Sequence, residues 1–347
     1  MTLSDDSDWQ NLSPQVQRAL SAGWNAGAMP TVASALYSRW WLLETWLRSL
    51  VYIELRSANG AAWADGLSAS SASRQRNDEK IQYMQPPDAQ DQLAYLDAGL
   101  LLRLTHDEWP LFGAYVPAQK IWAGRIEELK EIQNRIGHCR RPHEDDLDRL
   151  EQTLRDLNGG AFRATSSFKD QSHPNEHWSD GLVRDWLREA HSEGDLEEHA
   201  RRQYETTFSL AFSSHPWAQP LVANEDQLGC GAGYIWHARW YFCGGRTFNL
   251  AQFWEDIEID RDLIMVVCAD TQSSLQVSFS ALDDQQQVGD VIGRCFHAAL
   301  TNLGYHCADD DHVEWAGRYA VVDPRVHAAT PWAMIEPSTK GCIVFSA

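Results

Sequence analysis

Hydrophobic residues in the first half of the chain recur at steps of three and four, which is the spacing of amphipathic helices. The strongest stripe lies in residues 31–57, where Leu36, Trp40 and Leu43 share one helical face. Residues 67–76 lack such a stripe, are rich in Ser and Ala, and are predicted to form a loop. Helices are predicted over residues 13–20, 31–57, 91–104, 117–136 and 143–157.

The end of the last of these helices sets the first domain boundary. Asn158, Gly159 and Gly160 follow its final apolar residue, and such a run is typical of a helix C-terminus. Residues 161–179 are polar and include Pro174, so they are predicted to be a linker. The first domain is therefore predicted to be an all-helical bundle over residues 31–160, preceded by an N-terminal extension over residues 1–30.

The pattern changes in the second half of the chain. Three segments alternate or are rich in β-branched and aromatic residues, which is typical of strands. These segments are residues 234–242, 263–269 and 275–279, with further strand candidates at residues 313–322 and 342–346. Residues 180–212 and 288–303 have a helical pattern instead. We therefore predict a separate α+β domain over residues 180–347.

Composition narrows the class of protein. Of the 347 residues, 44% are hydrophobic and 22% are charged, as in an ordinary globular chain. The longest apolar clusters fall far short of the roughly 20 residues of a membrane span. The seven cysteines form no C-x-x-C pair, which argues against a zinc ribbon, and no metal site is predicted. Their odd number, without a secretory signal, favours reduced thiols and a cytoplasmic location with no membrane partner.

A net charge of −20 repels nucleic acid on average, so any function on nucleic acid requires a local basic patch. Residues 120–141 form one, because six basic side chains there outnumber three acidic ones. Asn134 and His138 lie four residues apart inside this segment and would project from one helical face. The basic side chains belong to Lys120, Arg125, Lys130, Arg135, Arg140 and Arg141.

The segment Asn134-Arg-Ile-Gly-His138, followed by Cys139-Arg-Arg-Pro-His143, resembles the HEPN superfamily, and in particular the HEPN domains of bacterial antiviral and toxin proteins. The signature of that family is an Arg, then a polar residue that is often Asn, then three residues and a His. The resemblance covers residues 30–157, including the first long helix with Glu44 and Arg48, and it does not extend into the α+β domain.

The resemblance implies a metal-independent endoribonuclease without a cofactor, which works as a homodimer with the two motifs facing each other. His138 would move protons or position the substrate, Asn134 would orient it, and Glu44 would hold the motif from the first helix. Such a protein would be the toxic effector of an anti-phage (abortive infection) or toxin–antitoxin system, with RNA and an antitoxin or phage-derived activator as partners. The α+β domain would then sense, target or regulate. Charge for RNA binding would come from Arg48, Arg135, Arg140 and Arg141.

The chain departs from this pattern at Gln133, which occupies the position of the motif Arg. An uncharged amide does not replace a bidentate cation at a phosphate. Three interpretations follow. The chain is a disarmed form of a toxic ribonuclease, which we favour; or it is a naturally inactive HEPN dimer that binds RNA, a nucleotide or a partner protein; or Arg135, Arg140 and Arg141 compensate for the missing cation.

Simpler interpretations exist for the same residues. His138 could cap a helix end near Pro142, and Glu44 with Arg48 could be an ordinary surface pair four residues apart. The tryptophans at positions 40, 41 and 46 are predicted to belong to the core or to a dimer interface rather than to a base-stacking surface. A pure interaction protein, whose acidic surface docks on a basic partner, is a further alternative.

Overall fold

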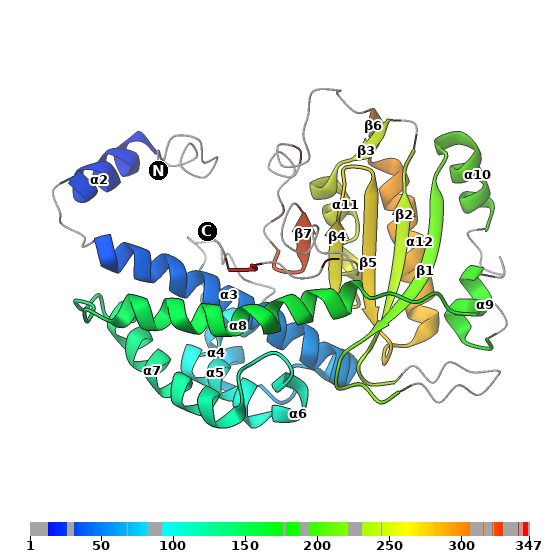
Figure 1. Ribbon diagram of the computed structural model, residues 1–347. Helices are drawn as coiled ribbons and strands as arrows, with labels where there is room; N and C mark the ends of the chain where they lie inside the picture. Colours follow the sequence, from blue (N-terminus) through cyan, green and yellow to red (C-terminus); the bar gives the residue numbers. More distant parts are fainter. Residues whose placement is uncertain are drawn as a thin grey trace.

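The computed structural model describes residues 13–25, 31–67, 69–81, 83, 92–175, 178–187, 194–220, 231–243, 245–305, 315, 321, 323–328, 339 and 343–345. These residues form an N-terminal helical unit and a C-terminal unit in which helices pack on a sheet (Figure 1). The chain is thus a helical region followed by an α+β region, as the sequence pattern predicts. Among the described residues, no helix is both long enough and apolar enough to cross a membrane.

Two long helices, α3 (Thr31–Asn59) and α8 (Asp146–Lys169), pack against each other and form the frame of the helical unit (Figure 1). They bury a continuous apolar core together with α5 and α7. The apolar stripe predicted for residues 31–57 is buried, which confirms the basis of that prediction. The other elements of this unit are α2 (Pro14–Asn25), η1 (Gly60–Ala62), α4 (Ala69–Asp78), η2 (Gln92–Tyr95), α5 (Ala98–Asp107), α6 (Trp109–Phe112) and α7 (Gln119–Gly137).

Five strands among the described residues form one sheet in the order β1-β2-β5-β4-β7. Its pairs are antiparallel except for β4 and β7, which run parallel. The strands are β1 (Thr207–Ser214), β2 (Tyr234–Tyr241), β4 (Val266–Ala269), β5 (Ser274–Ser280) and β7 (Val326–Ala328). A small second sheet pairs β3 (Arg246–Phe248) with β6 (Leu303–Tyr305), and the remaining helices are α9 (Gly181–Leu187), α10 (Gly194–Tyr204), α11 (Leu250–Asp256), η3 (Glu258–Asp260) and α12 (Gln285–Thr301).

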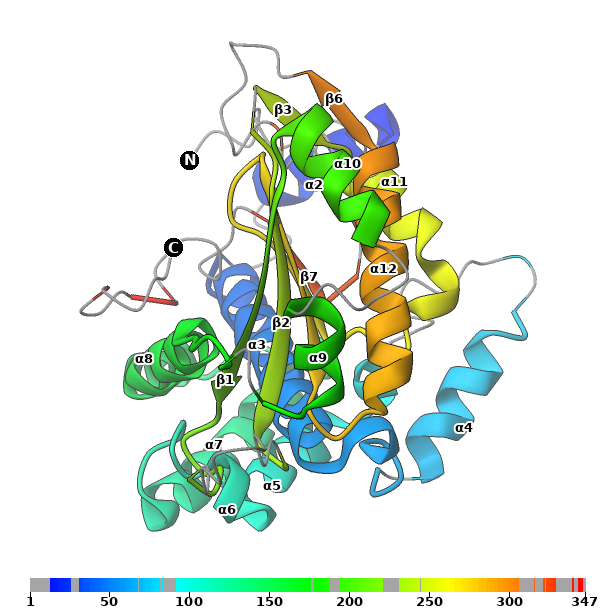
Figure 2. The ribbon, with the colours of Figure 1, turned by 90° about the vertical axis from the view of Figure 1, so that its right-hand side faces the viewer.

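Both faces of the large sheet are covered, because α9 and α12 lie on one face and α3 and α8 on the other (Figure 2). Strand β2 shows the consequence of the two-residue period. Trp236 and Trp240 belong to the core on the α12 side. Ile235, which points the opposite way, packs with Ile53 of α3 and Phe168 of α8.

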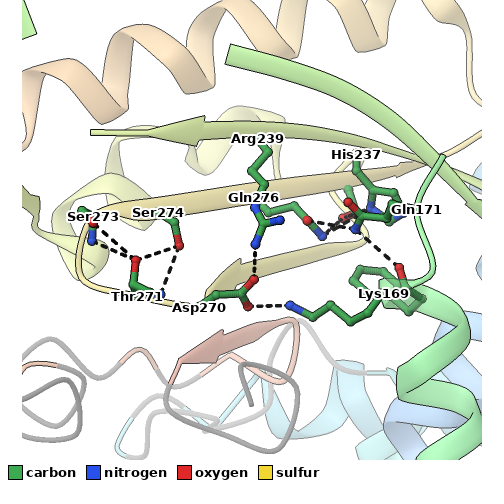
Figure 3. A network of polar contacts seen from close by, with 11 residues as sticks. Lys169, Gln171, His237, Arg239, Asp270, Thr271, Ser273, Ser274 and Gln276 are labelled. Carbon is green, nitrogen blue, oxygen red and sulfur yellow. Dashed lines mark hydrogen bonds and ion pairs between the residues drawn. The ribbon is translucent and has the colours of Figure 1, made fainter. Parts of the chain in front are cut away.

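A polar network joins the end of α8 to the sheet (Figure 3). Lys169 and Arg239 both bind the carboxylate of Asp270. Beside them, the imidazole of His237 is fully buried and bonds to the hydroxyls of Ser213 and Ser278 at 2.8 and 2.9 Å. Burial, with the positive charge of Lys169 nearby, holds the pKa of His237 well below its usual value. The interface between the two units is therefore polar as well as apolar.

The predicted boundary between the two domains is wrong in one respect. The helix expected to end at Asn158–Gly160 runs on to Lys169, so residues 161–169 of the predicted linker are helical. Gly160 is required here for space rather than as a stop signal, because a Cβ at this position would lie 1.7 Å from the carbonyl oxygen of Tyr115. A close helix contact and a helix end both favour glycine, and only the packed structure separates them.

Three other element predictions also need correction. Residues 69–76 of the expected loop belong to helix α4. The end of the helical segment predicted for residues 180–212 is strand β1, which is held in the sheet by its pairing with β2. In the candidate strand 342–346, Val344 and Phe345 lie in a turn, while most of the candidate strand 313–322 lies outside the described residues. The predicted strands 234–242, 263–269 and 275–279 and the helices 117–136 and 288–303 are confirmed within a few residues.

Candidate functional site

The motif singled out by sequence lies at the C-terminal end of α7. The helix closes with two backbone bonds, from the Cys139 N–H to the Ile136 carbonyl at 3.0 Å and from the Arg140 N–H to the Arg135 carbonyl at 2.8 Å. This is the Schellman arrangement, and Cys139 takes the left-handed position with φ of 51° that glycine usually occupies. The closure turns the chain away directly after His138, which leaves the side chains of Asn134 and His138 exposed.

A groove of about 220 Å³ runs between α3 and α7 beside this helix end. It brings Gln133 together with Glu44 and Arg48, two residues that sequence analysis placed near the motif. Asn134 and His138 do not line this groove but lie on the exposed surface next to it. The lining residues are Tyr37, Trp40, Trp41, Glu44, Thr45, Arg48, Gln133, Ile136 and Gly137.

The carboxylate of Glu44 is held from two sides within the α3–α7 groove. The indole N–H of Trp40 donates to its Oε2 at 2.6 Å, and the guanidinium of Arg48 binds its Oε1. The Nε of Arg48 is buried and has no hydrogen-bond partner among the described residues. Glu44 is therefore oriented and neutralised, while Arg48 keeps one open donor.

The tryptophans of α3 have three different environments. Trp40 is buried, as predicted, and Trp46 packs edge-on against Phe345 with ring centroids 5.2 Å apart. Trp41 is 59% exposed, so it does not belong to the core, and the alternative predicted for it, a dimer interface, stays a prediction. Its ring lies 6.4 Å from that of Tyr37, which is also half exposed, so the α3–α7 groove has an aromatic rim.

The basic patch predicted for residues 120–141 is smaller than the sequence count implies. Arg125 binds Glu128 and Asp156, and Lys130 binds Glu127. Arg135 makes a bidentate pair with the buried carboxylate of Asp146 at 2.5 and 2.7 Å. The basic side chains of this segment that are exposed and make no ion pair within the described residues belong to Lys120, Arg140 and Arg141.

The pair between Arg135 and Asp146 fastens the loop after the motif. The backbone N–H of His143 also donates to Asp146, at 2.9 Å. Burial by itself raises the pKa of this carboxyl, but the bonds from Arg135 and His143 outweigh it and the pKa lies below its usual value. Arg135, which sequence analysis placed among the RNA-binding residues, is therefore occupied in holding the loop that carries Arg140 and Arg141.

His143, Asp145 and Asp146 have ligand atoms within 4.8 Å of one another, which is close enough for a metal ion. Their carboxylates already have cationic partners, because Asp146 binds Arg135 and Asp145 binds Arg149 at 2.6 Å. A second positive charge would have to displace these guanidinium groups. We therefore interpret the cluster as the fastening of the loop between α7 and α8.

A second cavity, of about 160 Å³, lies where α3 meets the C-terminal unit. Arg48 belongs to its wall as well as to the α3–α7 groove. Sequence analysis missed this cavity, because nothing in the local pattern places Asp262 and Arg325 opposite α3. Its lining residues are Arg48, Ser49, Tyr52, Trp63, Gln92, Asp262, Pro324 and Arg325.

A buried polar cluster where α3 enters the C-terminal unit was also missed. Nε2 of His215 lies 2.8 Å from the hydroxyl of Ser57, and Nδ1 lies 3.0 Å from a carboxylate oxygen of Glu54. This order of groups is that of a Ser–His–Glu triad. However, the Ser57 hydroxyl donates to the Ile53 carbonyl at 2.8 Å, and all three side chains are buried. The cluster therefore ties the two units together rather than presenting a nucleophile.

Comparison of the chain with protein-family models, with curated protein sequences and with solved structures gives no significant match. The interpretation of the site accordingly depends on its own residues and geometry.

Proposed function

We propose that the helical unit is a HEPN-like endoribonuclease scaffold and that Gln133 disarms it in this chain. The observation that carries the proposal is the position of Gln133. It lines the α3–α7 groove with Glu44 and Arg48, one turn before the exposed side chain of His138. A cation at position 133 would enter a groove that already holds an oriented carboxylate.

The chemistry assigned to these residues needs no metal. In RNA cleavage the 2′-hydroxyl attacks the adjacent phosphate, and an imidazole moves the proton near neutral pH. His138 supplies that imidazole and Asn134 orients it or the substrate. A guanidinium would stabilise the charge that develops on the phosphate, and the Gln133 amide does not. The chain thus lacks one component of the site.

The exposed rim of the α3–α7 groove provides the surface for a second copy. Tyr37 and Trp41 are each more than half exposed, and solvated aromatic side chains side by side on a groove rim are typical of interfaces. Pairing through this rim would bring two copies of His138 into one cleft with Arg140 and Arg141 at its edge. The C-terminal unit, which contacts α3 and α8, would sense, target or regulate.

The test restores the cation. The Gln133→Arg variant is expected to cut bulk cellular RNA in EDTA, whereas the unmodified protein is not. Adding His138→Ala to that variant should lower the rate at least about 100-fold, the usual contribution of a general acid or base. Gln119→Arg is the matched control, because Gln119 is exposed on the same helix about 21 Å away along its axis. Cleavage products are resolved on a denaturing gel.

Two results would contradict the ribonuclease assignment. Cleavage by Gln119→Arg, or cleavage that survives His138→Ala, would show that the activity does not come from this site. Absence of cleavage by a folded Gln133→Arg protein would favour the second candidate function, an inactive dimer that binds RNA with Gln133 as its natural residue. In that case the unmodified protein should retain RNA on a filter, and Arg140→Glu should weaken the retention.

A further inference from the structure

The groove between α3 and α8 holds a short segment from the far end of the chain. Ile343, Val344 and Phe345 lie against this helix pair, and the Phe345 side chain is 3% exposed within the helical core. The three residues are separated from β7 by a connection of 14 residues, 329–342. A segment distant in sequence thus fills a site built entirely by the helical unit.

The segment is recognised through its main chain as well as its side chain. The Val344 N–H donates to Oδ1 of Asn158 on α8 at 2.6 Å. The Phe345 carbonyl accepts from Nη2 of Arg39 on α3 at 3.0 Å. Glu151 on α8 fixes that guanidinium from the other side, with a bidentate pair at 2.5 and 3.1 Å. One backbone donor and one backbone acceptor of the segment are therefore bound by two oriented side chains.

The aromatic ring has its own subsite. Phe345 packs edge-on against Trp46, with the ring planes at 88°, a favoured aromatic arrangement. A space of about 350 Å³ adjoins it, lined by Arg155 and Leu154 of α8 as well as by the residues that hold the segment. Within the part of the chain that the structure describes, the groove thus extends beyond the residues that occupy it, as a binding groove does.

We propose that the α3–α8 groove is a peptide-binding site and that residues 343–345 are its intramolecular ligand, bound reversibly. Its ligand class is a short peptide that presents a phenylalanine after an aliphatic residue. The occupant is this chain's own segment, because a connection of 14 residues keeps the segment at millimolar effective concentration around the groove. The inference is independent of the proposed ribonuclease activity.

The first test supplies the segment in trans. A fluorescein-labelled peptide of residues 339–347, with Cys342→Ser, is titrated into Phe345→Ala protein, whose own segment lacks the ring that packs on Trp46. Saturable binding is expected by fluorescence anisotropy. A peptide carrying Phe345→Ala should bind at least tenfold more weakly, and so should the intact peptide to Phe345→Ala/Asn158→Ala protein. Gln152→Ala on α8 is the matched control variant, since Gln152 does not line the groove.

The unmodified protein should bind the same peptide at least tenfold more weakly than Phe345→Ala protein, because its own segment competes. Equal binding to both proteins, or no binding to a Phe345→Ala protein that melts cooperatively, would overturn the proposal. A sedimentation shift with protein concentration that disappears in Phe345→Ala would also overturn it, because the occupant would then come from a second copy.

A second measurement does not depend on the folding of the variant. Hydrogen exchange at the Val344 amide of the unmodified protein should be faster than at core amides, such as that of Leu154 on α8. Saturating peptide should accelerate it several-fold by displacing the segment, and the Phe345→Ala peptide should leave it unchanged. A Val344 amide that exchanges only with global unfolding, with or without peptide, would show that the segment is a fixed part of the core.

Discussion

The ion pair between Arg56 and Asp283 is the sharpest test of how the two units are joined. Arg56 lies on α3 and Asp283 lies two residues before α12, and their side chains are 0% and 1% exposed. Two parallel hydrogen bonds connect them, Nη1 to Oδ1 at 2.7 Å and Nη2 to Oδ2 at 2.6 Å. Truncating the carboxylate in Asp283→Ala would leave a guanidinium without its counter-charge in the interior.

The magnitude follows from this burial. Breaking a buried pair by removing one partner costs about 3–5 kcal/mol, because the remaining charge cannot recover its hydration. A value at the upper end is expected, since Nε of Arg56 already lacks a partner among the described residues and the Leu263 carbonyl at 3.4 Å is a weak acceptor. Replacing both partners, in Arg56→Met/Asp283→Leu, removes the charges together and should recover most of the loss.

The assay is equilibrium urea unfolding, followed by tryptophan fluorescence and by far-ultraviolet circular dichroism. Arg202→Ala is the control, because it breaks an ion pair with Glu198 that is largely exposed and should change stability by less than about 1 kcal/mol. A loss below about 1 kcal/mol for Asp283→Ala would refute the reasoning. So would a double variant less stable than Asp283→Ala alone. Separation of the single transition into two would show that this pair couples the unfolding of the two units.

Three further predictions concern other parts of the structure. Cys139→Gly should raise the free energy of unfolding by up to about 1 kcal/mol, because it relieves the left-handed strain at the end of α7; urea midpoints measure this. Gly160→Ala should lower the free energy of unfolding by about 3 kcal/mol or more in the same assay, since the added methyl group would clash with the backbone of Tyr115. The pKa of His237 is depressed in the folded state, so as the pH falls the unfolded chain binds the proton first. Thermal melts should therefore show that this contribution to stability is complete above about pH 6.5 and is lost as the pH falls below that value. His237→Gln should reduce this acid dependence.

The proposed site shows where local pattern suffices and where it does not. The spacing of Asn134 and His138, and the end of the helix near His138, follow from residues within a few positions of one another. The partners of the basic side chains do not. Arg135 is neutralised by Asp146, eleven residues later, so the sequence count overstated the charge available to a phosphate. Ion pairs form between side chains that packing brings together, and a short stretch of sequence does not show which elements pack against each other.

The same division applies to the fold. By itself, the sequence determined most of the amphipathic helices, strands β2, β4 and β5 of the large sheet and the change from helical to α+β structure, because a 3.6- or two-residue period is a local property. Only the tertiary structure decided that Gly160 sits inside a helix against Tyr115, that Arg56 pairs with Asp283 across the units, and that Phe345 completes the helical core. Each of these depends on a contact between distant segments, and packing at close-packed density, rather than local propensity, selects such contacts.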